Sequence, residues 1–157
     1  MEQNGSATAA VGDRLRELVT GKIVEYDQPV PTAAAAAAQL GCDVGAIANS
    51  LVFAVGDEPL LIIASGAHRV RLERVAELLG VPAIGRADKQ FVLRATGQPV
   101  GGVAPIGHPR PIRTVVDVWL ERYDEVWAGA GTRHAMFSTT FDELVRLTGG
   151  LPAEVGD

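Results

Sequence analysis

Cysteine is nearly missing from this chain, and long apolar runs are missing altogether. Cys42 is the only cysteine among 157 residues, which excludes a disulfide framework and a metal site built from cysteines. No apolar run approaches the roughly 18 residues that a membrane-spanning helix needs. The N-terminal residues 1–6 also lack the basic and apolar regions of a secretory signal. We therefore expect a soluble, cytoplasmic protein with no membrane partner.

The chain also has no excess of positive charge. The formal net charge is −5 at pH 7, and Lys22 and Lys89 are the only lysines. Non-specific binding to DNA needs clustered lysine and arginine to neutralise phosphates, so we expect no DNA partner. Local groups of arginine remain at positions 69, 71 and 74 and at positions 110 and 113. One face of the molecule can therefore be positive although the whole chain is acidic.

The chain has the size and composition of one compact domain. Hydrophobic residues make up 47% of the chain, which has a mass of 16.5 kDa and a mean hydropathy of +0.16. This composition is sufficient for one hydrophobic core. We place a single domain at residues 13–150, between a mobile N-terminal tail at residues 1–12 and a C-terminal tail at residues 151–157.

Helical and strand patterns alternate along this domain. Apolar spacing, capping residues and glycines predict helices at residues 13–20, 32–40, 69–79, 88–96, 118–123 and 140–148. Short apolar runs predict strands at residues 22–26, 50–55, 60–64, 81–84, 112–116, 125–128 and 135–138. The runs at 50–55 and 60–64 form a predicted hairpin that we expect to be buried on both faces, because they are nearly continuous. The fold class is therefore α/β or α+β, with a mixed sheet of about six or seven strands.

A loop rich in glycine and proline, residues 97–108, is the most informative stretch of the chain. Gly101 and Gly102 let a backbone approach a ligand without a Cβ in the way, and Pro105 stiffens the turn. Such a loop can offer peptide N–H groups to an oxyanion or a carbonyl. Composition alone favours an ordinary connection between two packed elements, so a ligand-binding role for this loop needs support from other parts of the sequence.

Several segments, taken in order, resemble the YbaK family, the free-standing relatives of the editing domain in bacterial prolyl-tRNA synthetases. The resemblance runs from about Tyr26 to Gly150. It rests on matching order and spacing in five places: Thr32 leading an alanine-rich helix to Gly41, residues 47–53, residues 64–70, Thr96 and Gly97 with residues 101–108, and residues 130–132.

The resemblance implies a mixed, largely antiparallel, barrel-like sheet wrapped by helices. It also implies hydrolysis of the ester that joins a wrong amino acid to the terminal ribose of a tRNA. The family's glycine-to-proline motif falls on Gly101 through Pro105, where backbone amides would hold the aminoacyl carbonyl and help place the attacking water. Preorganised N–H donors at a developing oxyanion supply about 3–4 kcal/mol each, so no nucleophilic side chain is required.

The sequence departs from the family pattern at position 49. The family has a lysine before Ser-Leu-Val-Phe, and this chain has Asn49. A neutral amide forms hydrogen bonds of roughly 0.5–1.5 kcal/mol, against roughly 1.5–3 kcal/mol for an ammonium. Three interpretations of Asn49 stay open. The chain is a weakened or altered deacylase, a binding protein without catalysis, or one in which the lysine's role has passed to a nearby arginine or histidine.

The remaining candidate site residues follow from the resemblance and from side-chain chemistry. His108 ends the loop and can donate to the substrate or act as a general base, and a loop histidine bonded to backbone is an equal alternative. The candidate catalytic residues are Asn49, Gly101, Gly102, Pro105 and His108, and the candidate substrate-binding residues are Thr32, Ser65, Gly66, His68, Val103, Ala104 and Gly131. The three histidines have no matching carboxylate pattern, so we predict no metal and no cofactor.

The leading hypothesis is a trans-acting aminoacyl-tRNA deacylase, with tRNA(Pro) carrying alanine or cysteine as the first candidate substrates. Its partners would be the acceptor end of an aminoacyl-tRNA and a tRNA synthetase, and the oligomeric state is left open. A rival hypothesis, motivated by Asn49, is a non-catalytic module that binds aminoacyl-tRNA or an aminoacyl adenosine. A third hypothesis is an interaction subunit attached to a synthetase.

Overall fold

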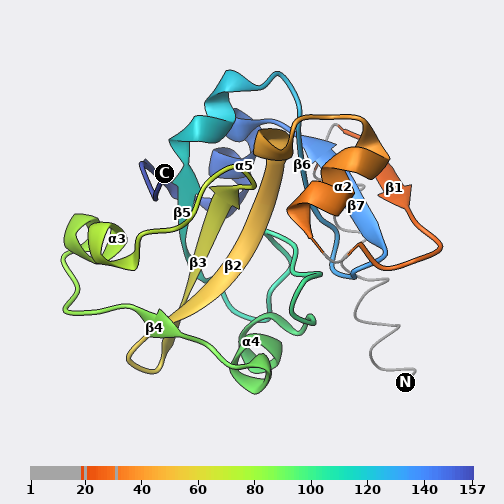
Figure 1. Ribbon diagram of the computed structural model, residues 1–157. Helices are drawn as coiled ribbons and strands as arrows, with labels where there is room; N and C mark the ends of the chain where they lie inside the picture. The colour runs from red at the N-terminus through yellow and green to blue at the C-terminus, as the bar shows by residue number, and fades with distance from the viewer. Residues whose placement is uncertain (1–18, 20, 31) are drawn as a thin grey trace.

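The computed structural model describes residue 19, residues 21–30 and residues 32–157. The predicted tail at 1–12 and the predicted helix at 13–20 lie outside this part of the chain, apart from Val19. The described strands are β1 (Ile23–Glu25), β2 (Ile47–Val55), β3 (Glu58–Ser65), β4 (Gly85–Arg86), β5 (Arg113–Asp117), β6 (Val126–Gly129), β7 (Ala135–Thr139) and β8 (Leu151–Ala153). They form one sheet in the order β1-β7-β6-β2-β3-β5-β8, with β4 paired to β2 (Figure 1). This mixed, mostly antiparallel sheet confirms the predicted fold class.

Local capping chemistry sets the bounds of the helices. Thr32 caps α2 (Ala33–Leu40) by accepting a hydrogen bond from the N–H of Ala35 at 3.0 Å. Asp88 caps α4 (Lys89–Thr96) in the same way, and the helix ends at Gly97 with a φ of 71°. These two helices are confirmed as predicted. The other described helices are α3 (Leu72–Leu79), α5 (Phe141–Thr148) and the 3₁₀ helices η1 (Val44–Ala46) and η2 (Val118–Arg122). Within the described residues, no helix has both the length and the apolar character of a membrane span.

Strand β3 forms the centre of the hydrophobic core. Leu61 and Ile63 face the larger cluster of buried side chains, which includes residues of β5, β6, β7 and α5. Leu60 and Ile62 face a second cluster together with Val75 of α3. Because successive side chains of a strand point to opposite faces, β3 is buried on both sides, as predicted.

Strand β2 was also expected to be buried on both faces, and this prediction is wrong. Most of its residues are only half-buried, and Leu51 is 36% exposed. The middle of β2 lines a cavity rather than packing under a helix. The predicted strand at 81–84 is wrong as well. The structure instead has β4 at Gly85–Arg86, where Arg86 and Gly85 pair with Phe53 and Ala54 of β2.

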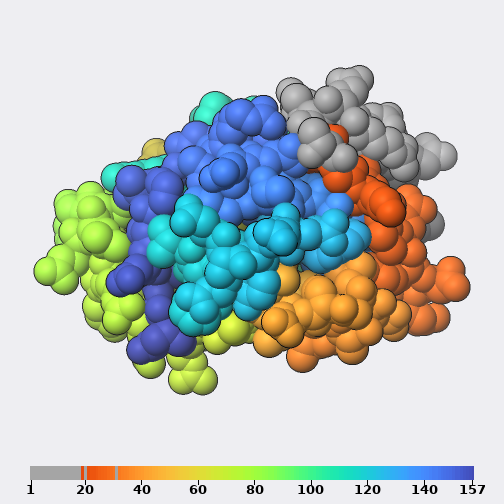
Figure 2. Space-filling view, turned by 90° about the horizontal axis from the view of Figure 1, so that it is seen from above, coloured from red at the N-terminus to blue at the C-terminus, as the bar shows by residue number. Residues whose placement is uncertain are grey.

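The predicted C-terminal tail at 151–157 is packed onto the domain. Strand β8 pairs in parallel with β5, with Leu151 opposite Val115, and the side chain of Val155 is fully buried. The N–H of Arg71 donates to the carbonyl of Val155 at 2.8 Å. Figure 2 shows these dark blue residues against the green segment that holds α3. The sequence contains no sign of this packing, because a three-residue strand has no strong pattern of its own and forms by pairing with β5.

Candidate functional site

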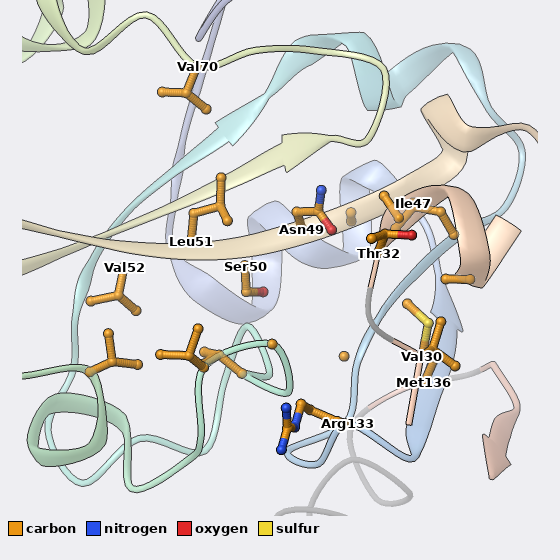
Figure 3. Close-up of a pocket in the computed structure, with 18 of the residues that line it drawn as sticks. Val30, Thr32, Ile47, Asn49, Ser50, Leu51, Val52, Val70, Arg133 and Met136 are labelled. Atoms are coloured by element: carbon orange, nitrogen blue, oxygen red, sulfur yellow. The ribbon is translucent and has the colours of Figure 1, made fainter. Parts of the chain in front are cut away.

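A cavity of about 610 Å³ opens beside the middle of β2 (Figure 3). Its volume is in the range of pockets that hold small molecules. Most of the described residues that line it come from β2, the start of α2, β4, the glycine-rich loop and the segment after β6, and α3, α4 and β7 contribute the others with the residues next to them. The lining residues that bear on chemistry are Thr32, Asn49, Ser50, Arg86, Gly101, Val103, Thr132 and Arg133.

One edge of β2 is open towards this cavity. The N–H of Gly66 donates to the carbonyl of Ile47 at 2.7 Å, which fixes the alternation of the antiparallel ladder between β2 and β3. Main-chain groups of Ser50 and Val52 consequently point away from β3. On that side β6 pairs only with residues 47–48 and β4 only with residues 53–54. Between them, no described strand pairs with residues 49–52, so peptide N–H and C=O groups are available to a ligand.

Alternation also decides which side chains of β2 face the loop. Figure 3 shows Ser50 and Val52 on the side of β2 where Arg133 lies, and Asn49 and Leu51 on the other side. The hydroxyl oxygen of Ser50 is buried and has no hydrogen-bond partner in the described part of the chain. Asn49 lines the same cavity as Gly101 and Val103, but the side chain of β2 that faces the loop side is that of Ser50.

Two residues of the glycine-rich loop combine a place in the cavity lining with an N–H group that has no partner among the described residues. The N–H of Gly102 donates to the carbonyl of Pro99 at 3.0 Å, and the N–H of Ala104 donates to Oε1 of Gln98 at 2.6 Å. These amides are therefore occupied. The N–H groups of Gly101 and Val103 have no partner among the residues described, and both residues line the cavity. The predicted run of donors from 101 to 105 is thus reduced to two.

Gly102 has a different role from the one that its sequence suggests. A Cβ at this position would lie 2.6 Å from the carbonyl carbon of Thr132 and 2.7 Å from the nitrogen of Arg133. The absence of a side chain therefore lets the loop pack on the segment after β6, rather than on a ligand. Gln98, which is 2% exposed, holds the loop from the other side through Ala104.

His108 and Pro105 lie outside the lining of this cavity. Both line a separate cavity of about 280 Å³ near the end of α5. Nε2 of His108 lies 2.8 Å from the carbonyl oxygen of Ala104 and donates to it. Of the two interpretations of His108, this geometry matches the loop histidine bonded to backbone.

Burial of His108 also makes stability depend on pH. Burial lowers the pKa of His108 below its ordinary value of 6.5, although the bond to Ala104 opposes this effect. Below about pH 6.5 the unfolded chain then binds more protons than the folded one, so stability is lost as the pH falls through the folded pKa. We expect His108→Gln, which keeps an N–H donor but does not titrate, to lose less stability than the wild type between about pH 7.5 and pH 5. Urea unfolding at both pH values measures this difference, and equal losses would contradict it.

Ser65, Gly66 and His68 gather in a second cluster, away from the lining of the cavity. Its centre is the fully buried Asp117, which accepts hydrogen bonds from the N–H of Ser65 and the N–H of Trp119, both at 3.0 Å. Nδ1 of His68 lies 2.8 Å from Oδ2 of Asp117. This cluster joins the end of β5 to the turn after β3.

Thr32 lies at the cavity, and Gly131 lies next to residues that line it. Thr32 lines the cavity, but its hydroxyl is already bonded to the first turn of α2. Gly131 is buried with a φ of 96° and turns the chain just before Thr132 and Arg133, which line the cavity. Among the residues described, no group of three or more His, Cys, Asp or Glu side chains is arranged to hold a metal ion.

Sequence reasoning missed Ser50 and Arg133. Ser50 is a polar residue within an apolar strand, and that signal was available in the sequence. Which of positions 49 and 50 faces the loop depends on pairing with β3 and could not be determined locally. Arg133 follows Gly131 and Thr132 in a turn whose contact with Gly101 exists only in the folded chain.

Known proteins share this sequence and fold. The chain is 30% identical over 123 residues to the uncharacterised protein YwhH of Bacillus subtilis (strain 168), covering 78% of each protein. It is 26% identical over 98 residues to a proline–tRNA ligase of Geobacter metallireducens, a match that covers 62% of this chain and 17% of the ligase.

Comparison with solved structures also finds a related protein. A crystal structure of a candidate trans-editing enzyme for prolyl-tRNA synthetase superimposes with a TM-score of 0.88 and 35% identity, covering 96% of this chain and 97% of the other. Residues 27–147 match the family described as "Aminoacyl-tRNA editing domain". The resemblance seen in the sequence is confirmed, and this chain belongs to the aminoacyl-tRNA editing domain family.

Proposed function

We propose that this protein hydrolyses the ester bond between a wrongly attached amino acid and the end of a tRNA, acting in trans. The observation that carries the proposal is the cavity of about 610 Å³, which is lined both by the open edge of β2 and by Gly101 and Val103, whose N–H groups have no partner among the described residues. Membership of the editing domain family supports the same reaction class.

The reaction needs stabilisation of charge on the ester carbonyl. A water oxygen bonds to the carbonyl carbon, the bond from that carbon to the ribose oxygen breaks, and the ribose oxygen takes up a proton. The products are a free amino acid and a tRNA with a free ribose hydroxyl. Negative charge develops on the carbonyl oxygen, and donors preorganised for it supply about 3–4 kcal/mol each. The amides of Gly101 and Val103 are the candidate donors.

No general base stands out in the cavity. Its described lining contains no histidine and no carboxylate, so the catalytic power depends on positioning and on the amides. The hydroxyl of Ser50, which has no partner among described residues, can hold the attacking water or the bound ester. Selection among amino acids then rests on the shape of the apolar wall, where steric exclusion acts as the second sieve of editing.

A binding module without catalysis is the second candidate function. The lack of a titratable base in the described lining and the neutral side chain of Asn49 favour it. In this alternative the cavity holds an aminoacyl adenosine, and the ester stays intact. The two functions differ in one measurable quantity, the rate of ester hydrolysis.

A panel of mischarged tRNAs tests the proposal. We expect tRNA(Pro) carrying alanine or cysteine to lose its amino acid about tenfold faster or more with the protein present, while tRNA(Pro) carrying proline is the control. Ser50→Ala should reduce the rate by about tenfold, because one hydrogen bond is lost. The matched variant Asn49→Ala, on the other side of the same strand, should have a smaller effect.

The same panel separates the alternatives. No acceleration with any mischarged tRNA defeats the deacylase proposal. Binding of substrate without hydrolysis by the wild type, together with hydrolysis by Asn49→Lys, would support the binding module. A larger effect of Asn49→Ala than of Ser50→Ala would show that the loop side of β2 is not the reactive side.

A further inference from the structure

Arginine supplies all the charge in the described lining of the cavity. Arg86 comes from β4, and Arg133 comes from the connection between β6 and β7. The ion pairs found among the described residues involve neither of them. The chain as a whole carries a net charge of −5. Two arginines that have no ion-pair partner among the described residues, in a cavity whose described lining has no carboxylate, therefore indicate an anionic ligand.

Arg133 is held against the loop that carries the amides of Gly101 and Val103. A Cβ at Gly101 would lie 3.2 Å from Cδ of Arg133, so the aliphatic stem of the arginine covers this glycine. Its main chain is fixed as well, because the N–H of Val30 donates to the carbonyl of Arg133 at 3.0 Å. Figure 3 shows the Arg133 side chain beside the cavity, on the side of β2 that Ser50 faces.

The two arginines lie near opposite ends of the open edge of β2. Arg86 is opposite Phe53, where β4 closes the edge. Arg133 follows β6, which closes the edge at Ala48. A ligand seated on residues 49–52 would therefore have a cation near each end. Arg133, which also contacts Gly101, is nearer to the amides where the ester is proposed to react.

We propose that Arg133 binds the phosphate on the terminal nucleoside of the substrate and thereby places the ester against Gly101 and Val103. This inference rests on the proposed function. The phosphate and the ester are attached to the same ribose, so both can be held by neighbouring residues of one cavity. A guanidinium offers two parallel N–H donors to phosphate oxygens, and this geometry fixes orientation as well as charge. Arg133 is thus a substrate-binding residue that selects nucleotide esters over simple amino acid esters.

Two small substrates that differ by one phosphate test this inference. They are the alanyl ester of adenosine and the alanyl ester of adenosine 5′-phosphate. We expect Arg133→Gln to raise the KM of the phosphorylated ester by about tenfold or more, and to raise the KM of the adenosine ester much less. Arg133→Lys should recover part of the loss, because it restores the charge without the paired donors. Arg110→Gln is the control, since Arg110 is exposed and lines the separate cavity near His108.

Binding of non-hydrolysable analogues keeps this test separate from the proposed function. In these analogues an amide N–H replaces the ester oxygen, and affinity is measured for the forms with and without phosphate. If wild type hydrolyses neither ester and no mischarged tRNA, the proposed function fails, whereas a phosphate-dependent loss of affinity in Arg133→Gln still supports phosphate binding. Equal losses for both analogues would mean that Arg133 only supports the loop. No loss for either would also overturn the inference.

Discussion

Replacing Asp117 with alanine is expected to lower the free energy of unfolding by about 3–5 kcal/mol. The carboxylate is fully buried and accepts hydrogen bonds from the N–H groups of Ser65 and Trp119, in addition to its contact with His68. Alanine would leave both main-chain donors and the His68 ring without this acceptor. It would also remove the N-terminal cap of η2.

Urea unfolding of Asp117→Ala and of two comparison variants measures this effect. Asp124→Ala removes an exposed carboxylate from the neighbouring turn and should change stability by no more than about 0.5 kcal/mol. Asp117→Asn keeps the shape and one acceptor oxygen, so its loss should lie between the two. A loss below about 1 kcal/mol for Asp117→Ala would show that water replaces the carboxylate at this position.

Replacing Gly102 with alanine is expected to reduce activity on mischarged tRNA by roughly a hundredfold. The added Cβ would meet the carbonyl carbon of Thr132 at 2.6 Å and the nitrogen of Arg133 at 2.7 Å. Both are main-chain atoms, so no side-chain rotation relieves the contact, and the loop must move away from the segment after β6. That movement displaces the amides of Gly101 and Val103. The free energy of unfolding should fall by about 1–3 kcal/mol.

Gly85→Ala is the matched control for Gly102→Ala. A Cβ at Gly85 would meet only the carbonyl oxygen of Ala54, at 3.9 Å, and Gly85 is exposed on β4. Initial deacylation rates and urea unfolding of both variants should separate them clearly. If Gly102→Ala retains the activity and stability of the wild type, the loop does not depend on its close contact with residues 132–133.

Features set by neighbouring residues could be predicted from the sequence. The caps at Thr32 and Asp88 and the stop at Gly97 are local interactions within one helical turn. The hairpin of β2 and β3 could be predicted because both strands have long apolar runs around a short turn. The glycine-rich loop stood out by its composition, and the family resemblance implied that it belongs to the site. Gly101 and Val103 of this loop line the cavity.

Features set by distant pairing could not be predicted in the same way. Strand β4 has two residues and β8 has three, so each exists only because a longer strand offers it hydrogen bonds. The direction in which Ser50 faces depends on the bond between Gly66 and Ile47, which fixes the alternation of the whole ladder. The occupied amide of Ala104 depends on the buried side chain of Gln98. The sequence alone therefore does not show which peptide N–H groups of the loop are left without a hydrogen-bond partner among the described residues.

The open stretch of β2 has a consequence for self-association. Unpaired strand edges are templates on which other chains can add strands and aggregate. Here β6 ends the open stretch at Ala48 and β4 ends it at Phe53, so an incoming strand would find only a few residues to pair with before meeting a neighbour. The molecule can therefore keep peptide groups exposed for a small ligand without offering a long edge for sheet extension.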